Sequence, residues 1–225
     1  SGEHSTAMGL STTASGDEST AMGDDTEASG NGATTMGRET VASAPATTAM
    51  GDETTASGVF STAMGERTEA NGNWSTAMGN TTIAETEQSL SIGSYNDANT
   101  SPDNTLFVVG NGEDTISNPD DRSDALVLDR TGNLTISGSL TQNSDRRLKT
   151  QIQPLEAGVL APLGEIEPVR FQFKDERTHP SGTQVGLIAQ EVQAQFPALV
   201  SEGASGHLSV SYSKFTAVLL KGLQE

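Results

Sequence analysis

The sequence contains no cysteine, which excludes disulfide bonds and thiolate metal sites as sources of stability. Aromatic residues make up 4% of the 225 residues and hydrophobic residues 33%, which is low for a compact enzyme. No apolar run approaches the ~20 residues that a membrane-spanning helix needs, so we expect no membrane insertion. The chain begins at Ser1 rather than Met, and we interpret it as a fragment whose export signal or anchor could lie upstream.

Basic residues are also scarce, and they are distributed unevenly along the chain. Residues 1–93 hold 13 acidic and 2 basic residues, and residues 94–143 hold 8 and 2, giving net charges of −11 and −6. Residues 144–225 hold 9 and 8, a net charge of −1. The acidic side chains of residues 1–143 repel one another and disfavour binding to nucleic acids. These changes predict three domains: a repeat shaft or head over 1–93, a β connector or tip over 94–143, and a separate domain over 144–225.

What the sequence does contain is a 14-residue repeat. The motif Ser5-Thr6-Ala7-Met8-Gly9 recurs without insertion at 19–23, 33–37, 47–51, 61–65, 75–79 and, in altered form, 89–93. A second motif of small residues, first seen at 14–16, lies between the copies. Periodic glycines and β-branched residues exclude a long helix. The repeat therefore predicts a solenoid of short parallel strands, each coil advancing by about one strand spacing, ~4.8 Å.

The methionines all occupy one position of this repeat, which Ile92 takes in the last copy: Met8, Met22, Met36, Met50, Met64 and Met78. Alternation along a strand puts Thr6 and Met8 on one face and Ala7 on the other. A narrow coil can enclose only small side chains, so we expect Ala7-type positions inside and the methionines outside. One chain cannot bury such an apolar column by itself, and we therefore expect a homotrimer.

The repeats over residues 5–93 resemble the heads of trimeric autotransporter adhesins, which share a Ser-x-Ala-x-Gly pattern. The resemblance implies a mainly β homotrimeric fibre whose chains form left-handed parallel β-rolls. Met stands where Ile is usual and Thr where Val is usual, and the softer Met side chain is expected to loosen the packing.

Phe60 and Trp74 lie one repeat apart and should meet on adjacent coils. Two interpretations are open. The two rings could form a platform on which a sugar ring stacks, or they could pack within a turn or against a neighbouring chain. We favour the second interpretation. His4, His179 and His207 are too scattered for a metal site, and no cofactor is expected.

Residues 94–143 lose the 14-residue period. Three strands are predicted, at 106–109, 125–128 and 134–136, with a tight turn at Gly132-Asn133 before the last. We expect a small β domain interwoven between three chains. Asp120, Asp121 and Asp124 lack the spacing of a calcium-binding loop and are interpreted as a solvated loop.

The remaining residues predict an α+β domain. Strands are expected at 169–173, 185–187 and 208–210, helices at 189–196 and 215–223, and a further helix that Pro154 opens at Leu155. Four blocks, at 144–149, 185–192, 196–197 and 208–212, resemble in order the C-terminal intramolecular chaperone of phage endosialidase tailspikes and tail fibres. The resemblance implies a domain that drives trimer assembly and then cuts itself off.

In that family a Ser–Lys dyad cleaves the chain just before the serine. The resemblance therefore implies Ser144 as the nucleophile, Lys149 as the base and the bond between Asn143 and Ser144 as the cleavage site. A lysine can act as a base only where burial lowers its pKa, and Leu148 and Ile152 could provide that burial after folding. The alternative is that Ser144 caps a turn and Lys149 is a surface charge.

Neighbouring charges bear on the same site. Arg146 and Arg147 would disfavour a further positive charge beside them. Asp145 is expected to support the turn rather than the chemistry.

The sequence thus predicts the C-terminal part of an extracellular fibre, on a bacterial surface or a phage tail. Its partners would be two further copies of itself and a receptor or cell-surface glycan. Its only enzymatic activity would be one self-cleavage, with none on external substrates. The alternatives are a purely structural spacer and a tailspike that carries a glycan-cleaving activity elsewhere.

Overall fold

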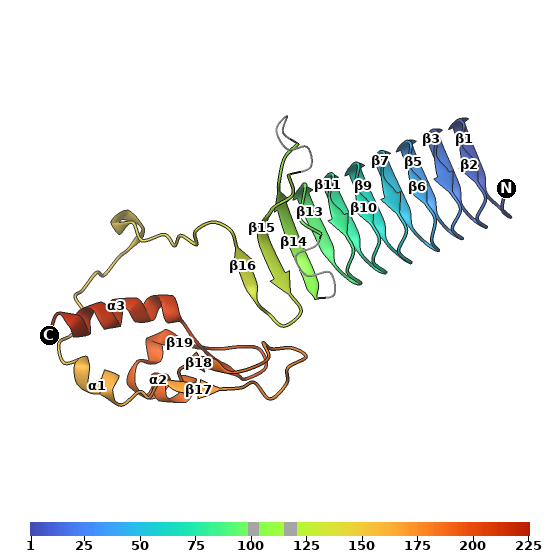
Figure 1. Ribbon diagram of the computed structural model, residues 1–225. Coiled ribbons are helices and arrows are strands. Elements are labelled where there is room, and N and C mark those ends of the chain that lie inside the picture. Colours follow the sequence, from blue (N-terminus) through green and yellow to red (C-terminus); the bar gives the residue numbers. More distant parts are fainter. Residues whose placement is uncertain (99–103, 115–120) are drawn as a thin grey trace. The chain divides into compact units, whose positions relative to one another are not determined.

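The computed structural model describes residues 1–98, 104–114 and 121–225. The chain divides into two compact units (Figure 1). The first comprises residues 1–140 and 177–180, and the second comprises residues 141–176 and 181–225.

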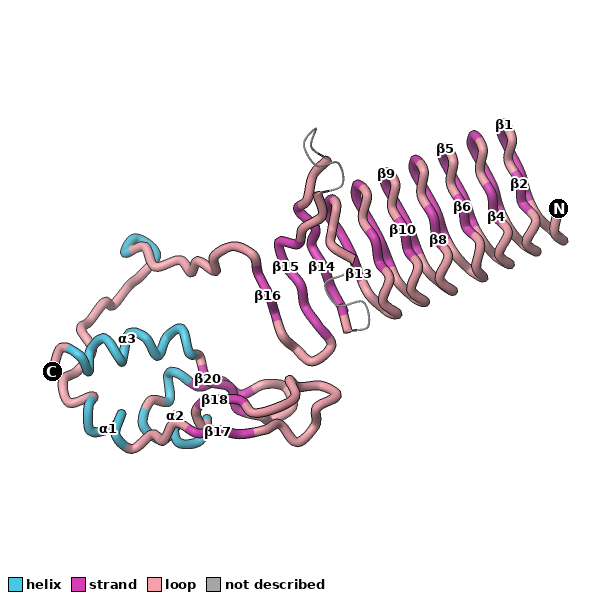
Figure 2. The backbone as a smooth tube through the Cα atoms, viewed as in Figure 1, coloured by secondary structure: helices cyan, strands magenta, loops and turns pink. Residues whose placement is uncertain are grey.

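The first unit is a parallel β-solenoid in which each coil contributes one longer and one shorter strand (Figure 2). The longer strands are β1 (Thr6–Leu10), β3 (Thr20–Asp24), β5 (Thr34–Arg38), β7 (Thr48–Asp52), β9 (Thr62–Glu66), β11 (Thr76–Asn80) and β13 (Leu90–Ser94). The shorter strands are β2 (Thr13–Ala14), β4 (Glu27–Ala28), β6 (Val41–Ala42), β8 (Thr55–Ala56), β10 (Glu69–Ala70) and β12 (Ile83–Ala84). The two sets form separate parallel sheets, which confirms the solenoid that the repeat predicts.

Small side chains fill the interior of each coil, as the alternation predicts. Ala49 of β7 and Ala56 of β8 are both 0% exposed, and their equivalents in the other coils are buried in the same way, except Ala7, which is exposed because no coil precedes it in the structure. A column of threonines that includes Thr54 and Thr68 is buried between the two sheets as well. The methionines lie on the opposite face of the longer strands, where most are half-buried.

Glycine recurs in the longer strands because the coils approach each other too closely for any side chain there. Gly51 has a φ of +126°, and a Cβ built on it would lie 1.9 Å from the carbonyl oxygen of Gly65 in the next coil. The repeated glycine is therefore required both by backbone conformation and by space.

The larger sheet continues beyond the repeats. Strand β14 (Thr105–Asn111) adds in parallel to β13, and β15 (Asp124–Asp129) and β16 (Leu134–Ile136) then add in antiparallel fashion, for ten strands in all. The three strands predicted between residues 106 and 136 are thus confirmed. Whether they interweave between chains stays a prediction.

Asp129 closes the turn between β15 and β16. Its Oδ1 accepts hydrogen bonds from the backbone N–H of Thr131 and of Asn133, both at 2.9 Å. Burial acts to raise the pKa of Asp129, but the hydrogen bonds from Asn133 and Thr131 outweigh it and hold this pKa below its usual value.

The second unit packs short elements around a small core. Its elements are η1 (Arg146–Leu148), α1 (Leu160–Gly164), β17 (Val169–Phe171), β18 (Gln184–Gly186), α2 (Ala189–Gln195), η2 (Pro197–Leu199), β19 (Val200–Glu202), β20 (Leu208–Val210) and α3 (Tyr212–Leu223). Strand β17 pairs with β18, and β19 with β20, both antiparallel. The buried apolar side chains are Val159, Ile166, Val192, Leu199, Phe215 and Val218.

Three predictions for this unit are wrong in their bounds. The last helix, expected from residue 215, begins at Tyr212. The helix expected from Leu155 begins only at Leu160, because Gly158 takes a φ of +90° and donates its N–H to Glu225 Oε1 at 2.8 Å. Strand β17 ends at Phe171. Phe173 instead packs edge-on against Phe171, with ring centroids 5.2 Å apart.

Candidate functional site

A single 3-10 turn, η1, brings Ser144 and Lys149 together. The backbone N–H of Lys149 donates to the carbonyl of Arg146 at 3.1 Å, and this bond closes the turn between Ser144 and Lys149. The Nζ of Lys149 then lies 2.7 Å from the Oγ of Ser144 and donates a hydrogen bond to it. An amine and a hydroxyl at this distance can exchange a proton directly.

Asp145 and Arg147 hold this turn from within. The carboxylate of Asp145 accepts from the backbone N–H of Arg147 at 2.8 Å and from its guanidinium at 2.6 Å. The hydrogen bonds of the Arg147 side chain, and then of its backbone, lower the pKa of Asp145. Asp145 thus supports the turn, as expected, and the ion pair offsets the positive charge of Arg147.

The turn lies on the surface of the single chain. Leu148 is 71% exposed and Ile152 49% exposed, although both are apolar. Ser144 and Lys149 are themselves exposed. Before the serine, the side-chain amide of Gln142 donates to the Oγ of Ser213 at the start of α3, at 3.4 Å. The burial that Leu148 and Ile152 were expected to provide is therefore absent within one chain.

Phe60 and Trp74 meet on adjacent coils, as their spacing predicts. Their ring centroids lie 6.0 Å apart and their planes differ by 7°. The two side chains are 55% and 51% exposed. The rings form a stacked pair on the surface of the first unit, which we call the aromatic pair.

An uninterrupted apolar column runs across all ten strands of the larger sheet. Strand register places these residues side by side in the order Met8, Met22, Met36, Met50, Met64, Met78, Ile92, Val109, Leu126 and Ile136. We call this column the apolar stripe. It extends the methionine column of the repeats through β14, β15 and β16, which the sequence analysis did not anticipate.

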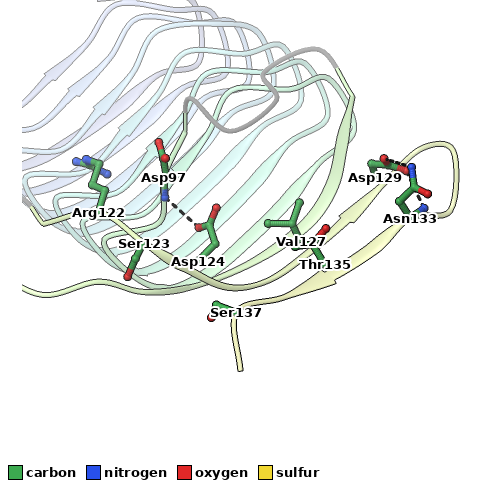
Figure 3. Close-up of a pocket in the computed structure, with 9 residues that line it drawn as sticks. All are labelled: Asp97, Arg122, Ser123, Asp124, Val127, Asp129, Asn133, Thr135 and Ser137. Carbon is green, nitrogen blue, oxygen red and sulfur yellow. Dashed lines mark hydrogen bonds between the residues drawn. The ribbon is translucent and has the colours of Figure 1, made fainter. Parts of the chain in front are cut away.

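A hollow of about 490 Å³ opens on the other face of β15 and β16, beside Val127 and Thr135 (Figure 3). At one end the Oδ1 of Asp124 accepts the backbone N–H of Asp97 at 3.0 Å, and at the other Asp129 holds its turn. Asp120 lies outside the described residues. In ranges 1–98, 104–114 and 121–225, no group of three or more His, Asp or Glu side chains is arranged to hold a metal ion.

Two family models match the chain, one in each unit. Residues 1–26, 14–40, 42–68, 56–82 and 70–96 match the YadA head domain repeat, and residues 144–201 match the chaperone of endosialidase. The chain joins YadA-type head repeats to an endosialidase-type chaperone domain. The first match begins with the solenoid coils, and the second begins at Ser144.

Together these matches support a trimeric adhesin or fibre with a C-terminal chaperone. The chaperone match belongs to a peptidase family, which suggests self-cleaving activity. YadA-type heads are exposed on surfaces, which is consistent with an extracellular or phage-tail location. Among the described residues, no helix has the length and apolar character required to cross a membrane.

Sequence reasoning missed the structural role of Arg122 in the first unit. Arg122 donates from its guanidinium to the backbone carbonyls of Thr81 and Asn96, at 3.1 and 3.2 Å. These bonds tie the segment before β15 to the last coils. No motif marks Arg122, because its partners are carbonyl groups 41 and 26 residues away.

Proposed function

We propose that this chain is the C-terminal part of a trimeric fibre, carried on a bacterial surface or a phage tail. Its second unit guides assembly and is then released by cleavage between Asn143 and Ser144. The observation that carries the cleavage is the 2.7 Å hydrogen bond from Lys149 Nζ to Ser144 Oγ. This distance supports a Ser–Lys dyad over the alternative in which Ser144 caps a turn and Lys149 is an unrelated surface charge.

The apolar stripe supports the trimer. Contiguous apolar surfaces on soluble proteins mark interaction sites, and this one extends along the whole sheet. Met8 at its open end is 61% exposed. Because every coil has the same register, identical chains side by side can bury the whole stripe against one another.

The chemistry needs only groups of the chain and one water. Lys149, once uncharged, takes the proton of the Ser144 hydroxyl while its Oγ attacks the carbonyl carbon of Asn143. The proton passes to the nitrogen of Ser144 as the peptide bond breaks, leaving an ester between the two residues. Water then hydrolyses the ester, which gives a carboxylate at Asn143 and restores the Ser144 hydroxyl.

Assembly would switch this reaction on. The Lys149 amine is exposed to water in one chain, whereas a lysine that acts as a general base needs a desolvated site. Leu148 and Ile152 lie uncovered beside it, and a partner chain packed on them would exclude water from the dyad. Cleavage would therefore follow correct packing of the three chains.

A fibre of this kind benefits from a temporary assembly domain. Long-range strand pairing between chains is slow, because the entropy of chain ordering is lost before contacts compensate for it. A compact C-terminal trimer raises the local concentration of the repeats and aligns them. Its removal afterwards leaves a fibre that is kinetically trapped.

Denaturing mass spectrometry of the full chain after folding tests the proposal. The wild type should yield two fragments, 1–143 and 144–225, while Ser144→Ala and Lys149→Ala stay whole. Ser139→Ala is the control, since this serine is exposed five residues before the dyad and should not affect cleavage. A trimeric wild type that stays intact, or a Lys149→Ala variant cleaved at the normal rate, would refute the dyad.

A further inference from the structure

The aromatic pair occupies a repeat position that is otherwise polar or small. The equivalent residues in the other coils are His4, Glu18, Gly32, Ala46 and Gln88. A column that faced a partner chain would be apolar in every coil, as the apolar stripe is. This column therefore faces solvent, and its two aromatic residues serve neither the coil interior nor the regular contact between chains.

The backbone makes this placement costly. Phe60 has a φ of +59° and Trp74 a φ of +54°, values at which bulky side chains are strained. Both side chains remain half exposed, so burial does not compensate for the strain. A left-handed residue stands at this position in every coil, as Glu18, Ala46 and Gln88 do, so the strain belongs to the turn and only the choice of two adjacent aromatic residues is particular to the pair.

The turns on the Phe60 side of the pair are uncharged, although the repeat region as a whole is acidic and the next turn beyond Trp74, at 85–88, holds Glu85 and Glu87. We define the uncharged patch as four successive turns along one edge of the solenoid, at 29–32, 43–46, 57–60 and 71–74, none of which holds a charged residue. The turns on the opposite edge in the same coils are charged, with Arg38, Glu39, Asp52, Glu53, Glu66 and Arg67. The uncharged patch offers no counter-ion to a cationic ligand or to an anionic one.

One ring face and one amide in the patch are available to a ligand. The pair's neighbours on the Phe60 side are Ala46 and Gly32, whose side chains are too small to cover the remaining face of Phe60. Asn73 directly precedes Trp74, and its Oδ1 accepts the backbone N–H of Val59 at 2.9 Å. Its Nδ2, which has no acceptor in the described part of the chain, remains a donor beside the rings.

We propose that the aromatic pair binds a neutral saccharide. The apolar C–H face of a pyranose ring would stack on the remaining face of Phe60, whose other face packs on Trp74, and its hydroxyl groups would bond to amides of the uncharged patch such as Asn73. The inference deepens the proposed function, on which it rests, because it names the class of receptor that the exposed fibre would recognise.

Trp74 is the only tryptophan of the chain, so tryptophan fluorescence reports on this site alone. The full-length protein is titrated with neutral oligosaccharides of glucose, mannose, galactose and N-acetylglucosamine, and in separate arms with sialylated oligosaccharides and oligolysine. We expect a saturable change in fluorescence with at least one neutral sugar. Phe60→Ala should weaken that binding at least roughly tenfold, in line with the loss of a stacking contact.

Gln88→Ala is the matched control, since it removes an exposed side chain at the same repeat position and should bind as the wild type does. The proposal is overturned if no neutral sugar changes the fluorescence up to about 10 mM, a weak affinity for any specific site. It is also overturned if only oligolysine or sialylated sugars bind, or if Phe60→Ala dissociates the trimer in sedimentation. Cleavage and trimer mass, read on the same samples, show whether the proposed fibre assembly stands independently of sugar binding.

Discussion

The side-chain amide of Asn96 pairs with the backbone of Ile83 in the way that a further strand would. Its Oδ1 accepts the N–H of Ile83 at 2.7 Å, and its Nδ2 donates to the carbonyl of Ile83 at 2.9 Å. In the preceding coils the equivalent N–H donates to a backbone carbonyl 13 residues ahead, as Glu69 does to Thr82. Asn96 is 1% exposed and ends the sheet of shorter strands at β12.

Replacement of Asn96 by Ala should therefore destabilise the solenoid at its C-terminal end. The N–H and carbonyl of Ile83 would lose both partners, at about 2–4 kcal/mol per chain for two buried groups. Chemical denaturation followed by circular dichroism measures the change. Asn71→Ala is the control, because the exposed side chain of Asn71 bonds only to the side chains of Ser57 and Glu69, so its loss should cost less than about 0.5 kcal/mol. Equal midpoints for the two variants would contradict the role given to Asn96.

Two glycine substitutions should differ strongly in their effect on stability. Gly51→Ala places a Cβ 1.9 Å from the Gly65 carbonyl and should prevent the coils from stacking, so that little folded protein forms. Gly32→Ala places its Cβ 4.0 Å from the nearest atom, at a position where Ala46 already has a φ of +54° one coil later. It should destabilise the protein only by about 1–2 kcal/mol, the cost of a left-handed backbone conformation for a residue with a Cβ. Soluble yield and thermal midpoint measure both, and a folded Gly51→Ala protein would disprove the close approach of the coils.

A charge in the apolar stripe should break the trimer without unfolding the coil. Met64 lies on the outer face of β9, half-buried between Met50 and Met78, so Met64→Lys keeps the interior intact. Burial of an unpaired ammonium between chains is unfavourable by several kcal/mol, and monomers should replace trimers in sedimentation. Gln88→Lys carries the same added charge on an exposed turn and should remain trimeric. A Met64→Lys trimer would argue against the stripe as the contact between chains.

The sequence predicted the repeat architecture well, because a strict period makes each local preference recur in register. The interior Ala and exterior Met faces follow from alternation alone, and the structure confirms both. The helix expected at Leu155 fails because Gly158 and Glu225, 67 residues apart, make a contact that no local pattern encodes. Asn96 could have been found in advance, since it stands 13 residues after Ile83, where the repeat places a carbonyl partner.

The dyad is a different case. Its residues came from a resemblance, and the five-residue spacing alone does not specify a contact. The contact depends on η1, whose geometry Asp145 and Arg147 determine. Ser144 and Lys149 are both exposed in the single chain, and under our proposal the desolvation that the chemistry requires would come from other copies of the chain.

Asp145 should act as a positioning residue for cleavage. Asp145→Ala removes the cap of η1 and the ion pair with Arg147, so Lys149 should spend less time within 2.7 Å of Ser144. A displacement of about 1 Å can lower such rates by up to ~100-fold, so we expect fragment 144–225 to form at least roughly tenfold more slowly. Mass spectrometry over time during folding measures this rate. Trimer mass on the same samples separates slow cleavage from failed assembly.

The lowered pKa of Asp145 determines the pH range in which protonation of its carboxylate should affect this turn. A carboxylate with a depressed folded-state pKa stabilises the turn fully above its unfolded value, ~3.9, and the stabilisation is lost as pH falls through the folded value. Between pH 5 and 9 the cap is therefore constant, and any change of cleavage rate there belongs to a group other than Asp145. Asp145→Asn should accordingly lower the rate by a constant factor across this range and leave the shape of the pH profile unchanged. A profile whose midpoint shifts in Asp145→Asn would instead place Asp145 in the proton transfer itself.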